Sequence, residues 1–255
     1  MDSVVRRPAL VAALLTAALV AWIVTAQRMR GMDAGPGTDL GAFGWFMGIW
    51  VTMMAAMMLP SAVPAVAMFA GLRPGAPAWA FVVGYLLAWA AVGLAAYGAY
   101  RALRELAPGV TAWDERGAWV AGAALIVAGV YQLTPLKTAC LRHCRAPLGF
   151  LLRGGPGRVG AVRTGLGHGA YCIGCCAGLM LALFALGVMS LVWMAAVAAV
   201  ILVEKLLPRG EAFARAAAVG LVAAGVWVAV APDSVPGLTD PAGTGMTPMR
   251  MEESP

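Results

Sequence analysis

Long apolar blocks separated by short polar or basic segments run through most of the chain. Each block approaches or exceeds the roughly 20 residues that a helix needs to cross the hydrocarbon core of a bilayer. The pattern predicts an all-α, polytopic helical membrane protein with about seven transmembrane helices, forming one domain over residues 1–231. A tail rich in proline, glycine and acidic residues, 232–255, is expected to be loosely ordered. The predicted spans cover about residues 9–26, 41–71, 78–100, 118–133, a block ending near 187, 188–207 and 212–230.

The block over residues 41–71 is too long for one straight span, and it contains Pro60 and Pro64. Because proline lacks a backbone N–H, we expect this second block to be kinked or broken near the segment M-M-L-P-S. Non-helical backbone at membrane depth persists only where it faces protein or a wet cavity, so such a break is a candidate functional feature. The alternative is an ordinary proline kink packed against neighbouring helices.

Composition supports a membrane protein, with 62% hydrophobic and 12% charged residues against about 25% charged in soluble domains. The first block is longer than a signal-peptide core and lacks a small-residue cleavage site, which predicts a retained helix. The net charge is +6, and the basic residues lie in short loops between the spans. No aromatic or glycine-rich segment that could bind bases or phosphates is interleaved with them, which argues against nucleic-acid binding. If the predicted spans alternate, the loops on the same side of the membrane as the N-terminus contain roughly twice as many lysines and arginines as the loops on the other side. The N-terminus and the cysteine-rich loop are therefore predicted to be cytoplasmic.

All five cysteines and both histidines fall within residues 134–180. Thr134 followed by Pro135 is a helix start, and Pro147 should follow the end of that helix. Three potential ligands lie at positions i, i+3 and i+4 of this helix and therefore share a face. They are Cys140, His143 and Cys144.

The second half of this window carries His168, Cys172, Cys175 and Cys176. Their helical spacing puts the first three on one face and leaves Cys176 at its border. Thiolates and imidazoles are the ligands that Cu(I) and Zn(II) prefer, and a reducing cytoplasm keeps thiols free. The spacing does not complete a zinc ribbon.

We therefore predict a metal site in this window. Lys137 and Arg142 lie beside the cysteines and are expected to favour thiolates there. The alternative is that the cysteines pack as small apolar residues, and this applies most to Cys176.

Methionine supplies a second group of soft ligands. Two i, i+4 pairs precede Pro60, and thioethers bind Cu(I) and little else of physiological abundance. The alternative is that these side chains fill gaps in an apolar core. The pairs are Met53 with Met57 and Met54 with Met58.

Several motifs resemble a known family. They are M-M-A-A-M-M-L-P-S (53–61), Y-Q-L-T-P-L-K-T-A-C-L-R-H-C-R-A-P (131–147), H-G-A-Y-C-I-G-C-C-A-G-L-M (168–180), G-V-M-S-L-V-W-M-A and E-K-L-L-P. They are similar to bacterial predicted metal-binding integral membrane proteins, long carried as a domain of unknown function. One branch accompanies a tyrosinase and is regarded as its copper chaperone. The resemblance covers roughly residues 41–208, although an aromatic residue often stands in that family where this chain has Ala177.

The resemblance implies a multipass protein of the bacterial cytoplasmic membrane that handles copper, with a copper-requiring protein as recipient. It also implies a ligand set to carry over: Cys140, His143, Cys144, His168, Cys172, Cys175 and Cys176.

The favoured hypothesis is therefore a copper chaperone or transfer factor, without enzymatic activity, that captures Cu(I) on the cysteines and passes it through the methionines. One alternative is a membrane thiol-disulfide oxidoreductase using the pairs Cys172/Cys175 and Cys140/Cys144. Another is a scaffold subunit stabilised by zinc. Both histidines lie in the cysteine window and no Gly-x4-Gly-Lys motif is present, which argues against a hydrolase or an ATP-driven pump.

Overall fold

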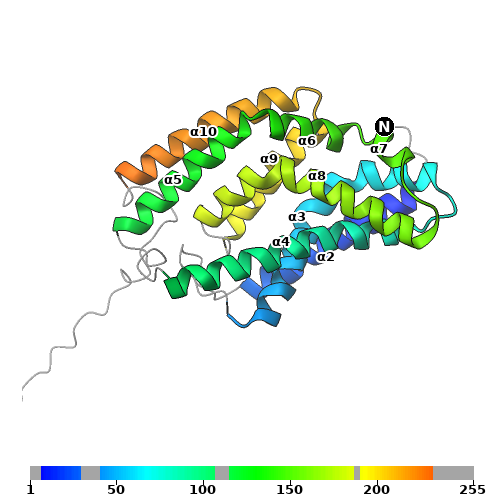
Figure 1. The fold of residues 1–255 in the computed structure, drawn as a ribbon, viewed down its shortest axis with the longest axis horizontal. Helices are drawn as coiled ribbons and strands as arrows, with labels where there is room; N and C mark the ends of the chain where they lie inside the picture. Colours follow the sequence, from blue (N-terminus) through cyan, green and yellow to red (C-terminus); the bar gives the residue numbers. More distant parts are fainter. Residues whose placement is uncertain (1–6, 30–40, 107–114, 187–189, 232–255) are drawn as a thin grey trace, which may run out of the picture.

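The computed structural model describes residues 7–29, 41–106, 115–186 and 190–231, and these residues are helical without a strand. The prediction of an all-α fold is confirmed (Figure 1). The tail over residues 232–255 and most of the predicted first loop lie outside the described residues. The helices are α2 (Pro8–Met29), α3 (Phe43–Leu72), α4 (Ala78–Leu106), α5 (Glu115–Gln132), α6 (Pro135–Arg145), α7 (Leu148–Leu152), α8 (Gly157–Leu186), α9 (Leu191–Leu206) and α10 (Gly210–Val230).

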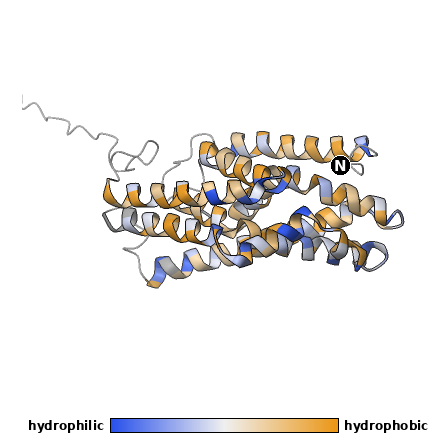
Figure 2. Cartoon of the chain, turned by 90° about the horizontal axis from the view of Figure 1, so that it is seen from above, coloured by the Kyte–Doolittle hydropathy of each residue, from blue (hydrophilic) through white to orange (hydrophobic). Residues whose placement is uncertain are grey.

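Five of these helices, α2, α3, α4, α8 and α10, are long and apolar enough to cross a membrane. The expected number of about seven was too high. Helix α9 has 16 residues, which at 1.5 Å per residue span about 24 Å and fall short of a hydrocarbon core of about 30 Å. Helix α5 qualifies only together with α6, and a bend of 63° separates the two, so the described residues contain at most six candidate spans. Figure 2 shows apolar residues along the helices and hydrophilic residues both at helix ends and within the bundle.

Helix α3 runs through both of its prolines without a break, so the prediction of a proline-broken second block was wrong. The physical reason is its central position, because 78% of its apolar window is buried against other helices. Pro60 and Pro64 are one turn apart, which confines the missing N–H donors to one face of the helix. The Ser61 hydroxyl donates to the Met58 carbonyl at 2.9 Å within the same turn. Packing on several sides thus maintains one long helix.

Helix α8 occupies the middle of the bundle, between α4, α5, α6 and α9 (Figure 1). Its backbone approaches α4 closely, since a Cβ on Gly84 would collide with the Val162 carbonyl and one on Gly165 with the Phe81 carbonyl. Small residues commonly permit such close helix contacts in membranes. This contact sets α8 against Tyr85 of α4, on the face that carries the cysteines.

Candidate metal centre

Three thiols of α8 form a buried cluster. The Sγ atoms of Cys172, Cys175 and Cys176 all lie within 4.8 Å of one another, and those of Cys175 and Cys176 are 3.5 Å apart. Two sulfurs bound to one ion through bonds of about 2.3 Å can be separated by at most about 4.6 Å. The cluster therefore needs only small side-chain rotations to bind a single ion. Cys176, which the helical spacing placed at the border of the ligand face, lies inside this group.

Helix α6 brings a fourth thiol to the cluster, because Cys144 Sγ lies 3.6 Å from Cys175 Sγ. The sequence-based boundaries of α6 are confirmed: Thr134 caps it by accepting from the Lys137 N–H at 3.3 Å, and the helix ends at Arg145.

Cys140 is one turn away on α6 and packs on Gly174, where an added Cβ would approach its Sγ to 2.6 Å. The described residues give Cys140 no hydrogen bond to another thiol. Four sulfurs thus converge, and Cys140 stays at the edge.

The two histidines do not join the thiols. His168 is buried one turn before Cys172, and its ring packs 5.7 Å from Phe81 and 5.8 Å from Tyr85. One helical turn separates residues by about 5.4 Å along the axis, so a shared face alone does not bring two side chains together.

His143 is exposed and stacks on Tyr171 at 4.4 Å between ring centroids. Its Nδ1 lies 2.9 Å from the carbonyl oxygen of Ala139 on its own helix. The structure therefore assembles sulfur ligands and leaves both imidazoles outside the cluster.

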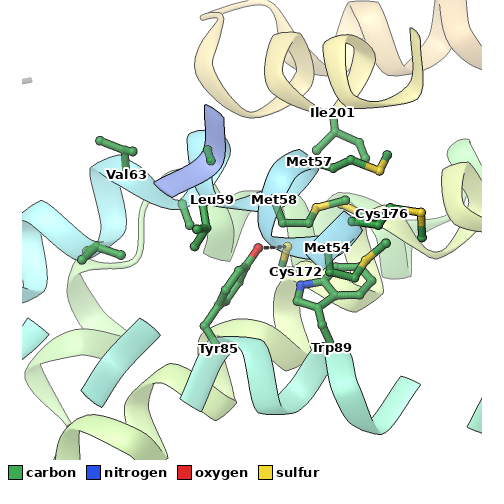
Figure 3. Packing of buried hydrophobic residues seen from close by; sticks show 14 of the residues in the cluster. Met54, Met57, Met58, Leu59, Val63, Tyr85, Trp89, Cys172, Cys176 and Ile201 are labelled. Carbon is green, nitrogen blue, oxygen red and sulfur yellow. Dashed lines mark hydrogen bonds between the residues drawn. The ribbon is translucent and has the colours of Figure 1, made fainter. Parts of the chain in front are cut away.

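Two polar partners of Cys172 were missed by the sequence analysis. Lys205 Nζ donates to Cys172 Sγ at 2.8 Å and to Ser61 Oγ at 3.2 Å. Tyr85 Oη lies 3.0 Å from the same sulfur, as the dashed line in Figure 3 shows. Glu204 and Lys205 lie within the predicted span 188–207 and had no role assigned to them, whereas the structure buries both. The available signal was that Leu206 and Leu207 follow this pair, so two ionisable residues lie inside the predicted span, where such residues are rare and often functional.

The cations expected beside the thiols are paired elsewhere. Lys137 Nζ contacts Glu204 Oε2 at 2.6 Å and also donates to the Gln132 amide oxygen. Arg142 forms an exposed ion pair with Glu211 at 3.3 Å. The prediction that Lys137 and Arg142 favour thiolates was therefore wrong, and Lys205 is the cation in contact with the cluster.

The methionines of α3 belong to the same buried core as the thiols of α8. Figure 3 shows Met54, Met57 and Met58 beside Cys172 and Cys176. All four side chains in the predicted pairs are nearly or completely buried. Thioethers and thiols from two helices thus adjoin in the centre of the bundle. The four methionines are Met53, Met54, Met57 and Met58.

The family model of PpoB2, a copper chaperone, matches residues 47–228. The chain belongs to the PpoB2 copper chaperone family. The match confirms the resemblance inferred from the sequence motifs and includes both the methionines of α3 and the thiols of α6 and α8. No curated protein and no solved structure matches the chain.

For a member of the PpoB2 copper chaperone family, the donor set has suitable chemistry. Thiolates and thioethers are soft ligands that suit Cu(I), whereas carboxylates and carbonyls suit harder ions. The thiols of α8 are joined by Cys144 of α6 and share a buried core with the methionines of α3, and the group of potential ligands found among the described residues contains sulfur and no carboxylate. Family membership also indicates metal handling rather than enzymatic turnover.

Proposed function

We propose that the protein is a membrane copper chaperone whose cargo, Cu(I), binds to Cys172, Cys175 and Cys176, with Cys144 as a further ligand. The observation that carries this proposal is the buried group of three Sγ atoms within 4.8 Å of one another. Its burial favours an ion of low charge, because each unneutralised charge is costly in an apolar interior. The contact of Lys205 with Cys172 supports the proposal, since an ammonium offsets the negative charge of a copper–thiolate group.

In this proposal the methionines of α3 form a second site that binds Cu(I) more weakly. A thioether is neutral, so it holds Cu(I) less strongly than a thiolate does and releases it more readily. The shared core of Met54, Met58 and Cys176 supports an exchange of ligands without passage through lipid (Figure 3). A copper-requiring recipient protein would receive the ion. The excess of basic residues near α6 and α8 favours a cytoplasmic location for the thiols in a bacterial cytoplasmic membrane.

Titration of anaerobically purified protein with Cu(I), against a chromophoric chelator, tests the proposal. We expect about one or two Cu(I) per chain. Replacing two central thiols, Cys172→Ser with Cys175→Ser, should abolish binding. The matched control is Cys140→Ser, which removes the thiol outside the cluster and should leave the stoichiometry unchanged. An unchanged stoichiometry in the double variant would refute the proposed site.

One observation favours a second candidate, a thiol-disulfide oxidoreductase. Cys144 and Cys175 are free thiols whose sulfurs are 3.6 Å apart, close enough to join after a small movement. An oxidising enzyme needs such thiols on the oxidising side of its membrane. A membrane-impermeant maleimide added to intact cells separates the two functions. Labelling of Cys144 from outside favours the oxidoreductase, and labelling only after permeabilisation favours the chaperone.

A further inference from the structure

A buried ion pair connects α6 to α9. Lys137 and Glu204 are 1% and 3% exposed at their side chains, and Gln132 Nε2 donates to Glu204 Oε1 at 2.9 Å, which completes the network. Burying two charges has a desolvation cost that the attraction between them often does not exceed, so stability alone does not account for such a pair. Its geometric effect is clearer, because it fixes α6 at one depth and one rotation relative to α9.

That rotation determines where Cys144 lies. Lys137, Leu141 and Cys144 occupy positions i, i+4 and i+7 of α6 and therefore share the face turned into the bundle. Leu141 is buried on this face, and Cys144 meets Cys175 at its far end. At the end of α6, Arg145 Nη2 donates to the carbonyls of Leu207 and Pro208 at 2.5 and 3.0 Å. These contacts hold α6 after the 63° bend that separates it from α5.

We infer that the Lys137–Glu204 ion pair is a positioning device that sets Cys144 as the closing sulfur ligand of the Cu(I) site. The inference rests on the proposed function and specifies how one ligand is placed. Glu204 is followed directly by Lys205, which contacts Cys172. One short segment of α9 thus contacts α6 through the pair of Glu204 with Lys137, and it contacts α8 through Lys205 and Cys172. Both thiol-bearing helices are therefore positioned relative to the same two residues of α9.

The first test measures alkylation of Cys144 in Cu(I)-loaded protein by a small maleimide, with peptide mass spectrometry as the readout. In the wild type, Cys144 should be protected by the bound ion. The double variant Lys137→Met with Glu204→Gln removes both charges and leaves no buried charge unpaired. We expect Cys144 to react roughly tenfold faster in this variant while Cys172 stays protected. The reversed pair, Lys137→Glu with Glu204→Lys, should restore protection.

A matched control lies on the same helix. Arg142→Gln breaks the exposed pair with Glu211 but leaves the buried pair intact, and such exposed pairs contribute little. Alkylation of Cys144 in this variant should match the wild type. An unprotected Cys144 in the loaded wild type, or equal protection in the wild type and the Lys137/Glu204 double variant, would overturn the inference.

The second test needs no metal, so it separates this inference from the proposed function. Diamide takes two electrons and two protons from two thiols, which join as a disulfide while the N=N bond of diamide becomes a hydrazine. The disulfide between Cys144 and Cys175 should form rapidly in the metal-free wild type and about tenfold more slowly in the double variant. Absence of Cu(I) binding by the wild type would refute the proposed function, and the disulfide rates would still decide the positioning. Equal rates would overturn it.

Discussion

Two lysines are buried in this bundle, and their surroundings differ. Lys137 meets the carboxylate of Glu204 and the amide of Gln132, so its charge is neutralised within the described residues. Lys205 meets the thiol of Cys172 and the hydroxyl of Ser61, and the described residues give it no carboxylate partner. The first lysine is part of a closed ion pair. The second is neutralised only when the neighbouring sulfurs are anionic, as they are when they bind a metal.

This difference separates a buried charge that only holds helices together from one that acts on a binding site. A closed pair can be exchanged for neutral groups at little net cost, whereas a charge beside potential ligands affects whatever those ligands bind. Removal of one partner alone should therefore destabilise the fold, whereas exchange of both Lys137 and Glu204 should mainly change the placement of α6. Lys205 should matter for the affinity of the cargo site.

The largest effect is expected when one member of the closed pair is removed. Glu204→Ala leaves the ammonium of Lys137 buried without a counter-charge, and we expect a loss of about 3–5 kcal/mol in unfolding free energy. The double variant Lys137→Met with Glu204→Gln should lose much less, since no unpaired charge remains. Chemical unfolding in detergent, followed by circular dichroism, measures both. A single variant no less stable than the double variant would contradict the comparison.

Removal of Lys205 should affect binding more than folding. Lys205→Met deletes a charged donor to Cys172, and such hydrogen bonds contribute about 1.5–3 kcal/mol, or roughly 10- to 150-fold in the Kd for Cu(I). Lys205→Arg keeps the charge and should recover part of the affinity. The chelator competition assay gives the Kd. If Lys205→Met bound Cu(I) as tightly as the wild type, the contact of Lys205 with Cys172 would not contribute to the affinity for Cu(I), and the contrast between the two lysines would fail.

Features that depend on local sequence were predictable. Thr134, Pro135 and Pro147 gave both ends of α6 because capping and proline placement act within a few residues. The clustering of cysteines in one short window likewise predicted a thiol site, and the structure brings four of the five together.

Features that depend on packing were not predictable in the same way. Pro60 favours a break locally, but burial of α3 on several sides keeps the helix continuous. The helical spacing placed Cys176 at the border of the ligand face of α8. However, α8 contacts helices on several sides, so side chains beyond that one face are also buried and can join the cluster. Lys205 and Tyr85 reach Cys172 from distant parts of the chain, which no spacing rule connects.

A smaller effect is expected from the neutral partner of Cys172. Tyr85→Phe removes one hydroxyl at 3.0 Å from the sulfur, and a neutral hydrogen bond contributes about 0.5–1.5 kcal/mol, or roughly 2- to 12-fold in the Kd. The matched control is Tyr97→Phe on the same helix, whose hydroxyl donates to the Gly41 carbonyl instead. Only the first variant should weaken Cu(I) binding. Equal effects in both would mean that Tyr85 acts through packing of α4 rather than through Cys172.

The smallest effect is expected at His143, although the resemblance to known sequences includes it among the ligands. Its ring is stacked on Tyr171 and its Nδ1 contacts the Ala139 carbonyl, so neither the ring plane nor that nitrogen faces the sulfurs. His143→Ala should change the Kd for Cu(I) by less than about twofold, the range of a surface substitution away from the site. The same chelator competition assay measures it. A loss near that of Lys205→Met would require the imidazole to leave Tyr171 and enter the cluster, and the bound site would then include a nitrogen ligand. Copper X-ray absorption spectra distinguish these two outcomes, because sulfur-only coordination lacks the imidazole scattering that a bound His143 would add.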